Sequence, residues 1–340
     1  MDRIRILLLR PESDDPSPVD QSLGARLSVV PDVLPYIVIE EDSFHRDDPA
    51  DLERALAVWE GKVAGVVGAM NVPESMRLGA LTERLNLLCF VANNNPVVWQ
   101  RRRNIFHIGM PTSQTTAAVT AALVRKSNLR RFLLLHDASE FQGCVAATMA
   151  TALRARGRDV RSQVHAPQDA VAIPDGWRPD LIYVVFSSER KALPIARAIR
   201  SDATDIPPGT PIVFGRSLLR DTFLTSLGDL PGEFWFVDTA FRRNNTQTEN
   251  QRRFMNVMAT NGIAIPTTNH AFGWDGMRFC ALALKAADGN PLHAIDYLES
   301  GISLEGASGT CSFSLDNHNG RLEPGPTTLT RWTNHQLEEV

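Results

Sequence analysis

Short apolar segments of the kind that form buried strands recur along the chain, and helical patterns separate most of them. The apolar segments lie at residues 4–9, 36–39, 63–67, 87–91, 132–135, 181–186, 211–214 and 234–237. The helical patterns lie at residues 48–60, 74–85, 113–127, 141–157, 190–201, 250–261 and 274–287. Strands that are apolar throughout, without alternation, are typical of a parallel sheet with helices on both faces. The alternation therefore predicts an α/β protein built from doubly wound parallel sheets.

Length and composition are those of an ordinary globular protein. The chain has 340 residues, of which 43% are hydrophobic and 22% charged, and this length predicts two core-forming units. The formal net charge of −4 argues against a nucleic-acid partner, since such domains carry a clustered basic face. The four cysteines are far apart and form no C-x-x-C pair, which supports neither a zinc site nor a redox motif.

Catalytic signatures are missing from the sequence. It contains no G-x-S-x-G, G-x-G-x-x-G, Walker A or H-E-x-x-H motif. His136, Asp137 and Ser139 resemble a triad in type only, because neighbouring residues at one strand end do not align nucleophile, base and orienting group. The aspartates around His45 are typical of helix caps and surface charge. We therefore expect a protein that is not an enzyme and has neither a metal site nor a catalytic cofactor.

The segment Gly306-Ala307-Ser308-Gly309, followed by Phe313, Asp316 and Gly320-Arg321, resembles a known closing motif. The motif, G-x-S-G-x-x-x-F-D-x-x-G-[DR], belongs to bacterial solute-binding proteins of the branched-chain amino-acid type, the extracytoplasmic receptors of ABC importers. Other segments resemble this family in the same order along the chain: Gly24-Ala25-Arg26-Leu27, 63–75, 88–96, 104–113, 133–143 and Trp274-Asp275-Gly276. His107 departs from the family's arginine, and Phe141 stands at its usual tyrosine.

The resemblance implies a type I periplasmic binding protein fold. Two lobes would be joined by a three-segment hinge, with the ligand cleft between them. We expect lobe one at residues 1–114 and 243–315, and lobe two at residues 115–242 and 316–340. The family implies a monomer that closes around its ligand and delivers it to an ABC transporter permease. It also implies a periplasmic location, with the export signal already removed from this chain. A cytoplasmic ligand sensor on the same fold is the alternative.

Residues at the carboxyl ends of parallel strands are the natural ligand contacts in open α/β sheets. Most of the candidates follow a predicted strand, whereas Phe141 and Trp274 are included because an aromatic ring can stack on a flat ligand. The candidate ligand contacts are Arg10, Ser75, Ala92, Asn93, Asn94, Phe141, Ser188, Arg190, Arg216, Thr239, Arg242 and Trp274. For each arginine the alternative is a solvated loop charge, and for the tryptophan it is core packing.

The arginines among these candidates favour an anionic ligand, because guanidinium groups bind carboxylates in a bidentate manner. The amino-acid receptors of the family hold the ligand ammonium with an acidic residue. Asp238 lies near that position, but Arg242 and Arg243 follow it. The chain resembles the branch associated with quinoprotein alcohol dehydrogenases that depend on pyrroloquinoline quinone (PQQ). That branch implies PQQ, a planar tricarboxylate, as the bound ligand. The alternative is a branched-chain amino acid or an amide, held by Ser75, Asn94, Phe141 and Asp238.

Overall fold

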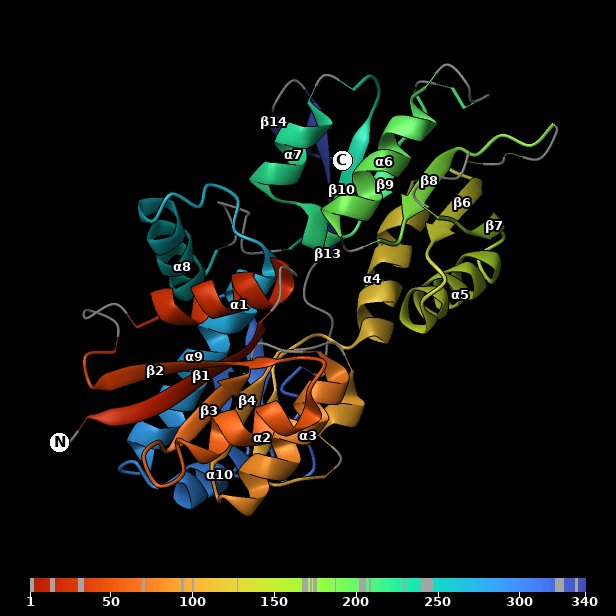
Figure 1. The fold of residues 1–340 in the computed structure, drawn as a ribbon. Helices are drawn as coiled ribbons and strands as arrows, with labels where there is room; N and C mark the ends of the chain where they lie inside the picture. The colour runs from red at the N-terminus through yellow and green to blue at the C-terminus, as the bar shows by residue number, and fades with distance from the viewer. Residues whose placement is uncertain are drawn as a thin grey trace. The chain divides into compact units, whose positions relative to one another are not determined.

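The computed structural model divides the chain into two units (Figure 1). The first comprises Met1–Pro111 and Phe241–Glu323, and the second comprises Thr112–Ala240 and Pro324–Val340. The structure describes residues 3–12, 16–29, 34–68, 71–92, 95–99, 101–126, 128–166, 171, 173, 176–186, 188–201, 206–207, 209–228, 230–239, 247–321, 327–333 and 336–340. Among these residues no helix is long and apolar enough to cross a membrane.

The first unit is built on a five-stranded sheet in the order β2-β1-β3-β4-β5, in which all neighbours are parallel. Its strands are β1 (Ile4–Glu12), β2 (Ile37–His45), β3 (Gly65–Gly68), β4 (Leu88–Val91) and β5 (Ile105–His107). A short antiparallel pair, β11 (Ser303–Glu305) and β12 (Thr310–Ser312), lies outside this sheet.

Helices cover both faces of the first sheet, as continuous apolar strands require. One face packs against α1 (Pro16–Leu27), α9 (Thr268–Ala286) and α10 (Pro291–Glu299), through a core that joins Leu8 and Phe90 to Phe279 and Ile295. The other face packs against α2 (Pro49–Ala57) and α3 (Val72–Arg84). The remaining helix of this unit, α8 (Glu249–Thr260), packs on α9 through Phe254.

The second unit is built on a seven-stranded sheet in the order β14-β13-β10-β9-β8-β6-β7. Five strands are mutually parallel: β6 (Arg131–His136), β7 (Asp159–Val164), β8 (Leu181–Val184), β9 (Ile212–Phe214) and β10 (Phe234–Thr239). The C-terminal strands β13 (Thr327–Thr333) and β14 (Gln336–Glu339) complete one side of the sheet as an antiparallel pair.

Among its described residues, the second unit has four α-helices. α4 (Thr112–Val124) and α5 (Glu140–Arg154) share one core with the sheet. α6 (Glu189–Ile199) and α7 (Asp221–Leu227) pack on each other, and Phe223 of α7 meets Phe214 of β9 edge-to-face at 5.0 Å between ring centroids. Phe214 follows Val213, which lies in the α4 and α5 core, so α7 covers the opposite face.

The fold class predicted from the sequence is confirmed, and each predicted strand and helix is present with shifted ends. The two largest shifts are at the end of β2, which runs to His45 rather than residue 39, and at the start of α9, which begins at Thr268 rather than residue 274. Its first turn is set by polar groups, because the Thr267 side chain and His270 form a capping box. An apolar periodicity does not reveal such a turn. The elements that the apolar and helical patterns did not predict are mostly short or polar: α1, β5, β7, α7, α10, β11, β12, β13 and β14.

Candidate functional site

Two predicted contacts of the first unit lie at the carboxyl end of its sheet, on the face covered by α1 and α9. Ala92 follows β4 and belongs to the core on that face. Arg10 lies two residues beyond Leu8, so the alternation of the strand places it on the same face. Arg10 is partly buried and forms no ion pair or hydrogen bond with any residue that the structure describes. A guanidinium is suited to bind an anion such as a carboxylate.

Helix α1 brings a polar side chain to this end of the sheet that the sequence did not point to. The amide nitrogen of Gln21 donates a hydrogen bond to the carbonyl oxygen of Ala92 at 3.1 Å. The same nitrogen lies 3.5 Å from the Oδ1 atom of Asn269, in the first turn of α9. Gln21 is 7% exposed and joins α1, α9 and the end of β4.

A buried polar cluster lies beside Gln21. The hydroxyl of Thr267 donates to the carboxylate of Asp20 at 2.7 Å, and the backbone N–H of Thr267 donates to Nδ1 of His270 at 3.0 Å. Because Nδ1 accepts, the ring proton of neutral His270 sits on Nε2, which lies 3.7 Å from Asp20. All three side chains are nearly inaccessible. The cluster fixes the start of α9 against α1.

Ser75 lies on a different element from Arg10 and Ala92. It is fully buried in the first turn of α3, the helix that packs on the opposite face of the sheet. Asn71 and Glu74 form a capping box at this helix start, and Glu74 also pairs with Arg46 at 2.6 Å. Ser75 therefore lies in the first turn of a helix rather than in the turn that directly follows β3.

Trp274 is enclosed within the first unit. Its side chain is 1% exposed and meets Phe254 edge-to-face, with 5.5 Å between ring centroids. The guanidinium of Arg278 lies 5.7 Å from the indole ring. No face of the indole is open to a flat ligand, so its position favours core packing, the alternative role that the sequence left open.

In the second unit, Phe141 lies at the carboxyl end of the sheet with its ring in solvent. It is 53% exposed and sits in the first turn of α5, which Ser139 caps. Nearby, the carboxylate of Asp137 accepts a hydrogen bond from Lys191 at 2.7 Å. Burial acts to raise the pKa of Asp137, but the bonds from Lys191 and Ser139 hold it below the usual value. Because its ring is exposed, Phe141 is suited to a stacking contact.

The remaining predicted contacts of this unit are more scattered. Ser188 precedes α6 without capping it through its side chain, and Arg190 is exposed in the first turn of that helix. Arg216 is partly buried after β9, close to Tyr183. Burial raises the pKa of Tyr183 to about 12, although the charge of Arg216 opposes that rise.

Some predicted contacts cannot be placed fully. Thr239 is the last residue of β10, but its side chain lies outside the described part of the chain, as do Asn93, Asn94 and Arg242. Asp238, the residue before Thr239, is 7% exposed and accepts a hydrogen bond from Thr330 of β13 at 3.0 Å. It is therefore a buried carboxylate near the carboxyl end of β10.

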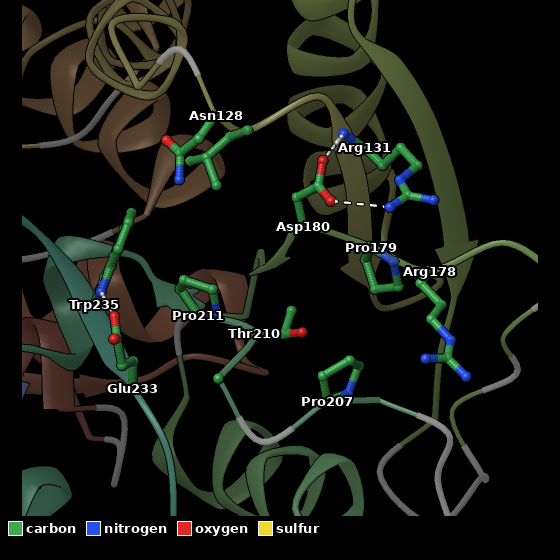
Figure 2. Close-up of a pocket in the computed structure, with 12 residues that line it drawn as sticks. Asn128, Arg131, Arg178, Pro179, Asp180, Pro207, Thr210, Pro211, Glu233 and Trp235 are labelled. Carbon is green, nitrogen blue, oxygen red and sulfur yellow. Dashed lines mark hydrogen bonds and ion pairs between the residues drawn. The ribbon is translucent and has the colours of Figure 1, made fainter.

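A hollow of about 460 Å³ lies at the opposite, amino end of the second sheet (Figure 2). Pro211 and Thr210 form its centre, and its charged groups are largely paired. Arg131 pairs with Asp180 at 3.2 Å, and the indole N–H of Trp235 donates to Glu233 at 3.0 Å. None of the predicted ligand contacts lines this hollow. It therefore gives no support to a ligand site at that end.

The closing motif forms a buried polar cradle rather than a binding surface. Asp275 is fully buried, and its carboxylate accepts the backbone N–H groups of Ala307 at 2.6 Å and Ser308 at 2.8 Å. The Ser308 hydroxyl also donates to Asp275, and Arg321 donates to that hydroxyl. A Cβ atom on Gly306 would overlap the carboxylate. Burial raises the pKa of Asp275 in spite of these bonds.

Comparison with solved structures gives matches over the whole chain. A leucine-binding protein from Thermotoga maritima is 14% identical, with 99% of this chain and 97% of that chain covered and a TM-score of 0.77. A branched-chain amino acid transporter substrate-binding protein from Streptococcus pneumoniae, in complex with isoleucine, is 19% identical, with 100% and 99% covered and a TM-score of 0.75. An ABC transporter solute-binding protein from R. palustris, in complex with 4-hydroxybenzoate, is 13% identical, with 100% and 96% covered and a TM-score of 0.74.

These similarities concern the fold. No curated protein matches the chain. The profile of one family, described as periplasmic binding protein, matches residues 45–334, which is most of the chain. The chain therefore belongs to the periplasmic binding protein family, and its fold is the type I fold of that family.

Proposed function

We propose that this protein is the solute-binding receptor of an ABC importer, acting as a monomer in the periplasm. Family membership supports a binding role. The similar structures from S. pneumoniae and R. palustris are substrate- or solute-binding proteins of transporters, which supports a role in import. A receptor of this kind binds one ligand and releases it unchanged to a permease. The proposal therefore includes no turnover and no catalytic cofactor.

The proposed ligand is a small planar molecule that carries at least one carboxylate. The position of Arg10 carries this proposal, because a partly buried guanidinium at a strand's carboxyl end, with no partner among the described residues, is suited to an anion. A charge-assisted bond to a carboxylate is worth about 1.5–3 kcal/mol. The exposed ring of Phe141 would add a stacking contact. PQQ remains our specific candidate within this class, since it would also use Arg190 and Arg216.

A branched-chain amino acid is the second candidate ligand. Asp238 favours it, because a buried carboxylate near the carboxyl end of β10 would suit an ammonium group. The relatives in complex with isoleucine and with 4-hydroxybenzoate illustrate both ligand types on this fold. The two candidates differ in whether Arg10 or Asp238 determines affinity.

A binding screen tests the proposal. Thermal unfolding is measured with PQQ, 4-hydroxybenzoate and leucine, since a ligand of the folded state raises the unfolding temperature by mass action. We expect a shift with at least one of the two aromatic carboxylates. A shift with leucine alone would reject the planar carboxylate and favour the amino acid.

Substitution of Arg10 tests the residue that carries the proposal. We expect Arg10→Ala to weaken binding of the aromatic carboxylate by roughly 10- to 100-fold, the equivalent of one charge-assisted bond. The unfolding temperature without ligand should stay unchanged, because Arg10 bonds to no described residue. Arg5→Ala is the control: Arg5 lies on the same strand but pairs with Glu40 at 2.6 Å. Equal affinity in the two variants would remove Arg10 from the site.

A further inference from the structure

We propose that Gln21 is a positioning residue for ligand binding, holding the end of β4 in the orientation that the ligand requires. The inference rests on the proposed function and on Ala92 as one of the ligand contacts predicted from the sequence. Gln21 is the side chain that reaches the Ala92 carbonyl, through a buried hydrogen bond of 3.1 Å across 71 residues of sequence. It acts through the backbone and needs no contact with the ligand itself.

The backbone of Gln21 is held by an unusually close crossing of two helices. A Cβ atom on Gly273 would overlap the carbonyl oxygen of Gln21, and a Cβ atom on Gly24 would overlap the carbonyl oxygen of His270. The backbones of α1 and α9 therefore touch at Gln21 and again about one turn later, at Gly24. Because the backbone of Gln21 is held by this contact, its side-chain amide has a fixed attachment. Its hydrogen bond therefore fixes the end of β4 relative to α1 and α9.

The energetics of Gln21 favour a role beyond packing. Its Oε1 atom is inaccessible and has no hydrogen-bond partner among the residues that the structure describes. An unsatisfied buried acceptor costs about 1–3 kcal/mol, whereas methionine fills a similar volume without that cost. The amide gains a directional bond to a carbonyl group that a methionine cannot make.

The first unit contains a matched control for Gln21. Asn104 is 4% exposed, and its amide nitrogen donates to Thr82 at 2.7 Å and to the Gly79 carbonyl at 3.2 Å. Its Oδ1 atom is also inaccessible, and no described residue forms a hydrogen bond with it. Asn104 precedes β5, at the amino end of the same sheet. The two amides thus share burial and bonding but lie at opposite ends of the strands.

Amide hydrogen exchange in Gln21→Met and Asn104→Leu tests the positioning role without any ligand. The Ile108 amide, which donates to Val91 at 3.1 Å, reports on the carboxyl end of β4, and the Cys89 amide, which donates to Asn104 at 2.8 Å, reports on the amino end. We expect Gln21→Met to speed exchange at Ile108 by about tenfold, the equivalent of one lost hydrogen bond, and not at Cys89. Asn104→Leu should show the reverse pattern.

Affinity gives the second readout, with PQQ, 4-hydroxybenzoate and leucine as the probes. Gln21→Met should lower the affinity for the probe that binds the wild type by about tenfold. Asn104→Leu should lose a similar amount of stability but keep the wild-type affinity. Equal affinity of the two variants for the probe would overturn the positioning role. Equal exchange rates of the Ile108 amide in the two variants would overturn it as well. If no probe binds the wild type, the proposed ligand class fails, and the exchange pattern alone then decides the role of Gln21.

Discussion

At the scale of single residues, Asp180 links the stability of the second unit to pH. Its carboxylate accepts the backbone N–H groups of Arg130 at 2.8 Å and Arg131 at 2.9 Å, and it pairs with the Arg131 guanidinium. Burial alone would raise the pKa of Asp180, but these bonds hold it below the usual value. A lowered pKa contributes stability above about pH 4, and this contribution is lost as the pH falls through the folded-state pKa.

We therefore expect Asp180→Asn to lower the free energy of unfolding by about 1–3 kcal/mol at neutral pH. The difference from the wild type should shrink as the pH falls below about 4, because the wild-type carboxylate then gains a proton. Urea unfolding at several pH values measures this. Glu338→Gln serves as the control, since Glu338 forms an exposed pair with Arg331 that is worth little. A difference that does not change with pH would exclude the charge of Asp180 as its source.

The residues of the closing motif and the residues of the proposed ligand site differ in how far the sequence predicts them. Gly306, Ser308 and Arg321 could be recognised as a family signature, but only the structure explains it, as a cradle for Asp275. Arg10 follows from the rule that strand ends contact ligands. Gln21 could not be predicted, because its partner Ala92 is 71 residues away and no local pattern joins them.

At the scale of elements, the crossing of α1 and α9 depends on glycine. We expect Gly24→Ala to lower the free energy of unfolding by about 3 kcal/mol or more, because the new methyl group must push apart two backbones rather than a flexible side chain. Chemical denaturation measures the loss. Gly209→Ala is the control, since a Cβ atom there meets nothing within 4 Å, and its effect should stay within about 0.5 kcal/mol. Equal stability of the two variants would contradict the close crossing.

The same crossing shows why α1 was difficult to predict. Its buried positions include Asp20, Gln21, Ser22 and Gly24, so the face that packs on α9 is polar or small rather than apolar. Hydrophobic periodicity cannot reveal such a face. β7 was difficult to predict for a related reason. It is the edge strand of its sheet, and only Val160 of its six residues is buried. By contrast, β3, β4 and β8 are buried along their whole length, and their apolar runs predicted them correctly.

At the scale of the whole molecule, both units are assembled from separate stretches of sequence. Residues 316–323 were expected in lobe two, but the structure groups them with the first unit, where His318 accepts a backbone bond from His107 at 2.8 Å. The last seventeen residues, 324–340, return to the second unit as β13 and β14. No local sequence pattern predicts that these residues join the second unit, because both strands are largely polar. They also pair in the antiparallel sense, next to strands that are mutually parallel.

Removal of residues 324–340 tests this division. The second sheet would lose β13, which pairs with β10 along six residues and supplies Leu329 to the core and Thr330 to Asp238. An exposed β10 edge and an unsatisfied buried carboxylate should destabilise the second unit strongly. The first unit keeps every one of its described strands, so its amide protection should persist. Hydrogen exchange distinguishes the outcomes: protection lost in β6, β8 and β9 but kept in β1, β3 and β4 is expected. Loss of protection in both sets together would mean that the two units fold as one cooperative body.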